Sequence, residues 1–113
     1  MSEKFKQISV RSGFMKYNGG ILFRRISNLE FEFKVKIDEN KLNSAGITHG
    51  GYICSVIDAG AGAAAHRASK NTNCVTISLD VKFIGVSKLG DEIIGFAKIQ
   101  KITNSLVFLN CYL

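Results

Sequence analysis

The chain has 113 residues and a formal net charge of +6, with 46% hydrophobic and 21% charged residues. That length allows one domain with a real core, and the composition is that of an ordinary globular protein. No apolar run approaches the roughly 20 residues needed to span a bilayer, and the N-terminal stretch lacks the apolar core of a secretion signal. The sequence therefore predicts a cytoplasmic protein without membrane insertion.

The charged and sulfur-containing residues exclude two further classes. The lysines are scattered and alternate with apolar residues, which indicates the solvated face of a sheet rather than a nucleic-acid surface. Cys54, Cys74 and Cys111 are widely spaced and form no CxxC pair, so we expect buried, reduced thiols and no metal site. Cys54 is a weak candidate nucleophile, because no histidine is placed to activate it.

The first half of the chain predicts two strands. Residues 4–12 are ambiguous and fit a short helix, and Asn18-Gly19-Gly20 signals a turn. Residues 21–26 fit a first strand. Residues 29–37 alternate apolar and charged side chains over their whole length, which predicts a half-buried strand. Residues 38–48 are polar and predict a loop.

A helix is predicted over residues 51–68. Its apolar stripe consists of Ile53, Val56, Ile57 and Gly60. Gly60 and Gly62 cost roughly 1 kcal/mol each relative to alanine inside a helix. That cost indicates that a sheet approaches the helix closely at these positions; a loosely packed surface helix is the alternative.

The second half predicts three strands in a meander. Residues 75–86 alternate apolar and polar side chains and predict a long strand. Residues 92–103 and 106–113 predict two more, after turns at residues 88–91 and 104–105. Two strands, one helix and then three strands make an α+β architecture.

The chemistry-bearing residues lie where the polar loop enters the helix. His49-Gly50-Gly51 precedes the helix directly, and Asp58 lies nine positions after His49. Two glycines at a helix start leave backbone N–H groups approachable, and such donors can hold an oxygen that gains negative charge. An oxyanion donor and a lone carboxylate on one element indicate acyl transfer.

This pattern resembles the hotdog-fold acyl-CoA thioesterases, and in particular the phenylacetyl-CoA thioesterase-like branch. The matching residues are Asn43, Gly46, His49, Gly50, Gly51 and Asp58. Residues 75–81 resemble the long strand that follows the central helix of that family, and residues 83–90 resemble its aromatic-to-glycine turn. The resemblance covers roughly residues 20–113.

The resemblance implies a hotdog fold, in which an antiparallel sheet wraps a central helix, as a single domain over residues 1–113. By the same comparison the family's usual last strand is missing, which fits either a trimmed chain or a shortened member. It also implies protomers that pair their sheets edge to edge and share active sites, and two such dimers that form a homotetramer. The expected substrate is an acyl-coenzyme A, and no metal or cofactor is expected.

Roles for the site residues follow from the resemblance. The Gly50 N–H is expected to hold the thioester carbonyl oxygen, and Gly51 to allow close approach. Asp58 is expected to act either as the base that activates water or as the nucleophile. Asn43 would position the reacting groups, and Thr76 would touch the catalytic water from the protomer opposite the other partners of Asp58.

The remaining assignments concern substrate binding. His49 is expected to hydrogen-bond the loop backbone beside the substrate, whereas His66 is expected at the surface. Lys70, Lys82 and Lys88 are expected to contact the nucleotide tail of coenzyme A.

Two other functions stay open at this point. A hotdog hydratase or dehydratase uses a histidine and an acid in a different spacing, which His49 does not fit. A non-catalytic acyl-CoA-binding protein is the alternative to an enzyme. The sequence does not name the acyl group, because aromatic, medium-chain and long-chain groups all fit.

Overall fold

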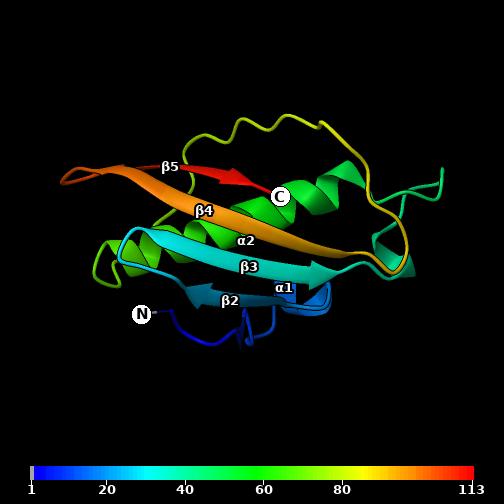
Figure 1. Cartoon of the computed structure of the whole chain (residues 1–113), viewed down its shortest axis with the longest axis horizontal. Helices are drawn as coiled ribbons and strands as arrows, with labels where there is room; N and C mark the ends of the chain where they lie inside the picture. Colours follow the sequence, from blue (N-terminus) through cyan, green and yellow to red (C-terminus); the bar gives the residue numbers. More distant parts are fainter. Residues whose placement is uncertain (1) are drawn as a thin grey trace.

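An antiparallel sheet with one long helix across its inner face forms the structure, a computed structural model that describes residues 2–113 (Figure 1). The sheet has five strands in the order β1-β2-β3-β4-β5. Their bounds are Lys6–Ile8, Ile21–Arg25, Glu30–Lys36, Glu92–Ile102 and Val107–Tyr112. The helices are α1 (Phe14–Tyr17), a 3-10 turn (Glu39–Lys41) and α2 (Gly50–Ala68). The predicted α+β hotdog arrangement of helix and sheet is confirmed.

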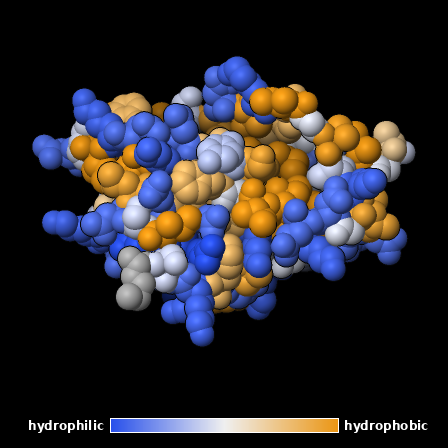
Figure 2. Space-filling model, in the orientation of Figure 1, coloured by the Kyte–Doolittle hydropathy of each residue, from blue (hydrophilic) through white to orange (hydrophobic). Residues whose placement is uncertain are grey.

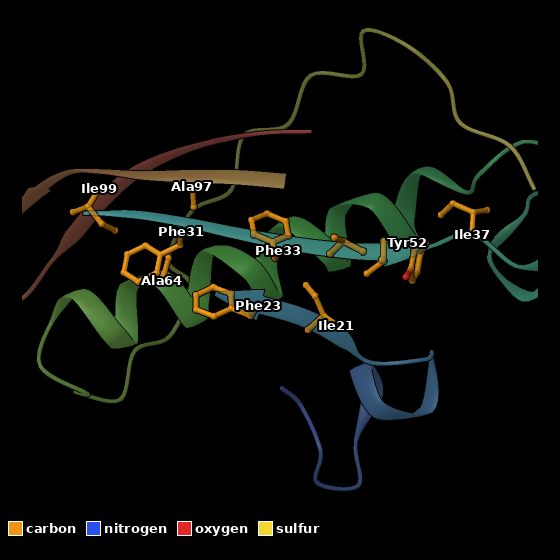
Figure 3. Close-up of a cluster of buried hydrophobic side chains, with 11 residues drawn as sticks. Ile21, Phe23, Phe31, Phe33, Ile37, Tyr52, Ala64, Ala97 and Ile99 are labelled. Carbon is orange, nitrogen blue, oxygen red and sulfur yellow. The ribbon is translucent and has the colours of Figure 1, made fainter. Parts of the chain in front are cut away.

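Strand β3 shows how the side-chain pattern builds the core. Phe31, Phe33 and Val35 are buried on the face toward α2, while the charged residues between them lie on the outer face. Phe23 of β2 stacks on Phe31 with ring centroids 5.6 Å apart. These rings fill the space between sheet and helix (Figure 3). The alternation that predicted this strand therefore also fixes which face is buried.

Helix α2 begins one residue before the predicted start, and its buried stripe keeps the predicted Val56 and Gly60 but not the two isoleucines. The fully buried positions on the sheet side recur every four residues: Tyr52, Val56, Gly60 and Ala64. Ile53 and Ile57, which were expected on the core stripe, are half-buried and line a cleft on another side of the helix. Small residues at 60 and 64 bring the helix close to the sheet, so this face is preferred over the bulkier isoleucines.

The close approach predicted at Gly60 is confirmed. A Cβ atom added to Gly60 would lie 2.5 Å from the ring carbons of Phe33. Gly95 of β4 stands directly opposite Phe33 in the ladder, and a Cβ there would also collide with the ring. The Phe33 ring thus lies between two glycines, one from the helix and one from the sheet. Gly62 differs, because nothing lies within 4 Å of its added Cβ.

The prediction of a long strand over residues 75–86 is wrong for this structure. Residues 70–91, called the connecting segment below, run from α2 to β4 and arc past β5 outside the sheet (Figure 1). No backbone–backbone hydrogen bond joins residues 73–86 to the rest of the described chain. Val75 is 89% exposed and Ile84 is 97% exposed. Alternation makes a strand only where a neighbouring strand satisfies its backbone groups, and here β5 does not reach the segment.

Three smaller predictions also need correction. Residues 4–12 contain the short strand β1 rather than a helix, because Lys6–Ile8 pairs with β2. The thiols are free as expected, but Cys74 is exposed and Cys54 and Cys111 are only half-buried. His66 is half-buried rather than on the surface, and its Nδ1–H donates to the Thr72 carbonyl at 2.8 Å. Over residues 2–113, no helix has the length and apolar character that crossing a bilayer requires.

The two helical glycines give a matched test of this packing. Gly60→Ala should lower the free energy of unfolding by about 1–3 kcal/mol, because the new methyl group overlaps the Phe33 ring. Gly62→Ala should raise it by about 0.5–1 kcal/mol, because alanine favours the helix and meets open space. Urea unfolding followed by circular dichroism measures both. Equal effects of the two substitutions would contradict the close approach at Gly60.

Candidate functional site

A cleft of about 2040 Å³ lies between α2, β5 and the connecting segment. The four residues expected to be catalytic line it, namely Asn43, Gly50, Asp58 and Thr76, as do the expected substrate contacts Lys70 and Lys82. They come from the loop before α2, from α2 itself and from the connecting segment. The structure therefore brings these sequence-predicted positions to one cavity.

Asp58 and Thr76 are in direct contact. The Thr76 hydroxyl donates a hydrogen bond to Asp58 Oδ1 at 2.5 Å. Asp58 is exposed in the single chain, and its other oxygen makes no hydrogen bond to a described residue. One carboxylate oxygen is thus held in place while the second is free to take a proton. Thr76 and Asp58 meet within one protomer, on the same side of the cleft.

The Gly50 N–H is an unpaired donor at the N-terminus of α2. The helix hydrogen bonds begin with Tyr52 and Ile53, whose N–H groups both donate to the His49 carbonyl. Among the described residues nothing accepts from the Gly50 N–H. A free N–H at the positive end of a 19-residue helix suits an oxygen that becomes negative.

Asn43 closes the loop that leads into α2. Its Oδ1 accepts from the Ala45 N–H at 2.9 Å and from the Ile47 N–H at 3.3 Å. The side-chain amide N–H groups make no hydrogen bond to a described residue. The side-chain oxygen of Asn43 therefore stabilises the loop, while its amide N–H groups remain available to a ligand in the cleft.

His49 is the cap of α2. Its Nδ1 accepts from the Gly51 N–H at 2.8 Å, which satisfies one of the donors that a helix start leaves unpaired. The ring is exposed and is not among the residues that line the cleft. Gly51 is used for this cap, so only the neighbouring Gly50 offers a free donor.

The three lysines expected at the nucleotide tail do not form one patch. Lys70 follows the C-terminal end of α2, in a left-handed conformation with φ of 58°. Lys88 bridges to Ile47 at the opposite end of that helix. Lys82 lies between them on the connecting segment and pairs with Asp80 at 3.3 Å. No single phosphate group can reach both helix ends.

Two contacts at the mouth of the cleft were not predicted. The Ser87 hydroxyl donates to Thr48 Oγ1 at 2.6 Å, and the Thr48 N–H donates to the Ser87 carbonyl at 2.9 Å. The Phe83 ring lies against Gly50, 3.4 Å from where a Cβ would stand. The aromatic residue was visible in the sequence, but its partner depends on the path of the connecting segment.

Helix geometry separates the two halves of the expected chemistry. Gly50 and Asp58 are eight residues apart on α2, which is about 12 Å along the axis at about 1.5 Å per residue. The oxyanion donor must lie within about 3 Å of the carbonyl oxygen. The base must lie within about 3 Å of the water that attacks the same carbonyl carbon. One chain therefore cannot direct its own Gly50 and Asp58 at the same thioester.

Two observations concern metal ligands and thiols in residues 2–113. The described chain holds no group of three histidine, cysteine or acidic side chains that could ligate a metal. Burial raises the pKa of the Cys111 thiol to about 11, which leaves it protonated and a poor nucleophile near neutral pH.

Comparison with known proteins identifies relatives of this chain. The model of the family described as the thioesterase superfamily matches residues 45–112. A Pseudomonas aeruginosa protein named "Putative esterase PA0474" is 26% identical over 112 residues, which cover 98% of this chain and 84% of that protein.

Two solved structures share the fold. Zebra fish thioesterase superfamily member 2 superimposes with a TM-score of 0.78 at 19% identity, over 88% of this chain and 72% of that one. Thioesterase superfamily member 2 from Mus musculus gives a TM-score of 0.66 at 22% identity, over 80% of this chain and 66% of that one.

The His49 cap can be tested by substitution. His49→Ala should destabilise the protein by about 1 kcal/mol, because the Gly51 N–H loses its acceptor. His49→Asn should recover most of that loss, since asparagine is a strong N-cap residue. The measurement is the urea midpoint of the three proteins. An equal loss in both variants would show that the ring matters by packing instead.

Thiol reactivity should follow exposure and the Cys111 pKa. At pH 8 we expect iodoacetamide to modify the exposed Cys74 first, and Cys111 only slowly. Because the thiolate is the reactive form, the Cys111 rate should rise about tenfold per pH unit up to about pH 11. Peptide mass spectrometry of time points resolves the sites. Rapid labelling of Cys111 in the folded protein at pH 8 would refute the burial of this thiol.

Proposed function

The chain belongs to the thioesterase superfamily, and we propose that it hydrolyses an acyl-coenzyme A thioester to a free acid and coenzyme A. The observation that carries the proposal is the Thr76–Asp58 hydrogen bond, which positions a carboxylate in the cleft; the Gly50 N–H that acts with it would come from a second protomer. A positioned carboxylate and an oxyanion donor are the two groups that hydrolysis of a thioester requires.

The reaction can be written with these residues. The free oxygen of Asp58 takes a proton from water while the water oxygen bonds to the thioester carbonyl carbon. The carbonyl oxygen becomes negative and is held by the Gly50 N–H, with the Asn43 amide as a second donor. The carbon–sulfur bond then breaks, and the coenzyme A thiolate takes up a proton. Direct attack by Asp58, through a mixed anhydride, is the alternative route.

The separation along α2 supports a site that two protomers share. One protomer would supply Gly50 and Asn43, and its partner would supply Asp58 and Thr76. A homodimer with two such sites follows from the symmetry, because each protomer has both halves.

The outer face of the sheet supports further assembly into a dimer of dimers. Phe96 of β4 and Tyr112 of β5 lie there with ring centroids 5.4 Å apart. Ile94 and Phe108 share this face and are about half exposed. Hydrophobic residues occupy the middle of this face among hydrophilic ones (Figure 2). An exposed apolar patch of this kind is typical of a protein interface.

The acyl group would lie in the apolar part of the cleft. Ile53, Ile57 and Ala61 line it from α2, and Leu109 lines it from β5. The cleft has room for an aromatic group such as phenylacetyl as well as for a medium or long chain, so its volume does not choose between them. Lys70 and Lys82, which line the cleft, would meet the coenzyme A phosphates, with Lys88 as a contact outside the lining.

The proposal predicts that turnover depends on Asp58. Asp58→Asn should lower kcat by about 10²–10⁴-fold on the best substrate, since the amide cannot accept the proton from water. Thr76→Val should lower it by about 10–100-fold, since a hydrogen bond to a charged group contributes about 1.5–3 kcal/mol. The assay is thiol release from acyl-CoAs ranging from acetyl through phenylacetyl to palmitoyl.

Glu39→Gln is the control, because Glu39 is an exposed acid that does not line the cleft. It should keep wild-type turnover. A folded wild-type protein that binds an acyl-CoA without releasing thiol would instead identify a non-catalytic acyl-CoA-binding protein.

A further inference from the structure

We infer that Phe83 selects acyl groups that are unbranched at the carbon next to the thioester carbonyl. The inference rests on the proposed function, because it takes the Gly50 N–H as the donor to the thioester oxygen. It adds a specificity-determining residue from the connecting segment.

The Phe83 ring is the side chain nearest to Gly50 from outside the helix. Its Cε1 and Cζ atoms lie 3.4 Å from the position that a Cβ of Gly50 would take. A Cβ at Gly50 would be in ordinary van der Waals contact with the ring, so the ring edge limits the space beside this glycine to about one methyl group. Phe83 is 58% exposed, so the rest of the ring stands out over the cleft that it lines.

The stretch of chain that carries Phe83 is attached to the rest of the protein both before and after this residue. Toward its C-terminal end, Ser87 and Thr48 are joined by two hydrogen bonds of 2.6 and 2.9 Å. Toward its N-terminal end, Thr76 is bound to Asp58. Phe83 lies between these attachments and closer to the Ser87 one. These attachments keep the stretch that carries Phe83 beside α2, although no backbone hydrogen bond holds residue 83 itself.

A thioester bound at Gly50 must lie against this ring. The amide nitrogen is about 1.5 Å from Cα, and the bound carbonyl oxygen would be about 2.9 Å from that nitrogen. We place the carbonyl carbon and the first carbon of the acyl chain in the narrow space between Gly50 and this ring. A linear chain would then leave along the apolar wall of α2, whereas a methyl branch on the first carbon would meet the ring.

The contact has a measurable consequence for isomeric substrates. A single methylene in a hydrophobic pocket changes kcat/KM by about 10–200-fold. Wild-type protein should therefore hydrolyse the best unbranched acyl-CoA at least about tenfold better, by kcat/KM, than its 2-methyl analogue. In Phe83→Ala the space beside Gly50 opens, and the preference should fall to within about threefold.

Ile84→Ala is the matched control on the same segment. Ile84 is 97% exposed and makes no contact with Gly50, so this variant removes apolar surface but leaves the ring in place. It should keep the wild-type preference. Circular dichroism and size-exclusion chromatography of all three proteins show whether fold and assembly are equal, and the ratio of two substrates on one protein does not depend on the active fraction.

The outcomes separate the two claims. A collapsed preference in Phe83→Ala with a retained one in Ile84→Ala supports the inference. Wild-type turnover with an unchanged preference in Phe83→Ala overturns the inference and leaves the proposed function standing. Wild-type protein without turnover on either thioester overturns the proposed function, and the inference with it.

Discussion

The packing of the Phe33 ring between Gly60 and Gly95 is the contact on which the site depends. It fixes the distance between α2 and the sheet, and it also fixes the rotation of the helix about its axis. Asp58 precedes Gly60 by two residues, which is about 200° around a helix with 3.6 residues per turn. With Gly60 against the sheet, Asp58 must point away from it, into the cleft. A hydrophobic contact in the core thereby orients the proposed catalytic carboxylate.

The same helix carries two functions at different points of its length. Its first turn presents a bare donor at the positive end of the dipole, and its middle presents a carboxylate bound by Thr76. These groups are too far apart to serve one substrate within one chain. In the site proposed above, assembly is part of the chemistry, since two helices must meet before one site is complete. Loss of protomer pairing would then abolish activity without any change in Asp58 or Gly50.

The sequence predicted most of the fold because strand alternation records which face is buried. Residues 30–36 show this, since three apolar positions there are the centre of the core. The strand predicted from alternation in residues 75–86 did not form. Alternation shows which side chains share a face, but it does not specify a neighbouring strand that pairs with the segment. The glycines at the start of α2 were identified, since helix starts have local signals. The contacts of Phe83 and Ser87 were not, because they depend on where a segment without regular structure crosses the helix.

The connecting segment has one further consequence, for the way such a chain can change over generations. Residues 73–86 contribute side chains to the cleft but no backbone bonds to the sheet. Substitutions there alter the lining of the cavity and leave the buried rings around Phe33 in place. Mutations can thus change the proposed substrate preference and the stability of the fold separately. This separation favours the evolution of new substrate preferences on one stable fold.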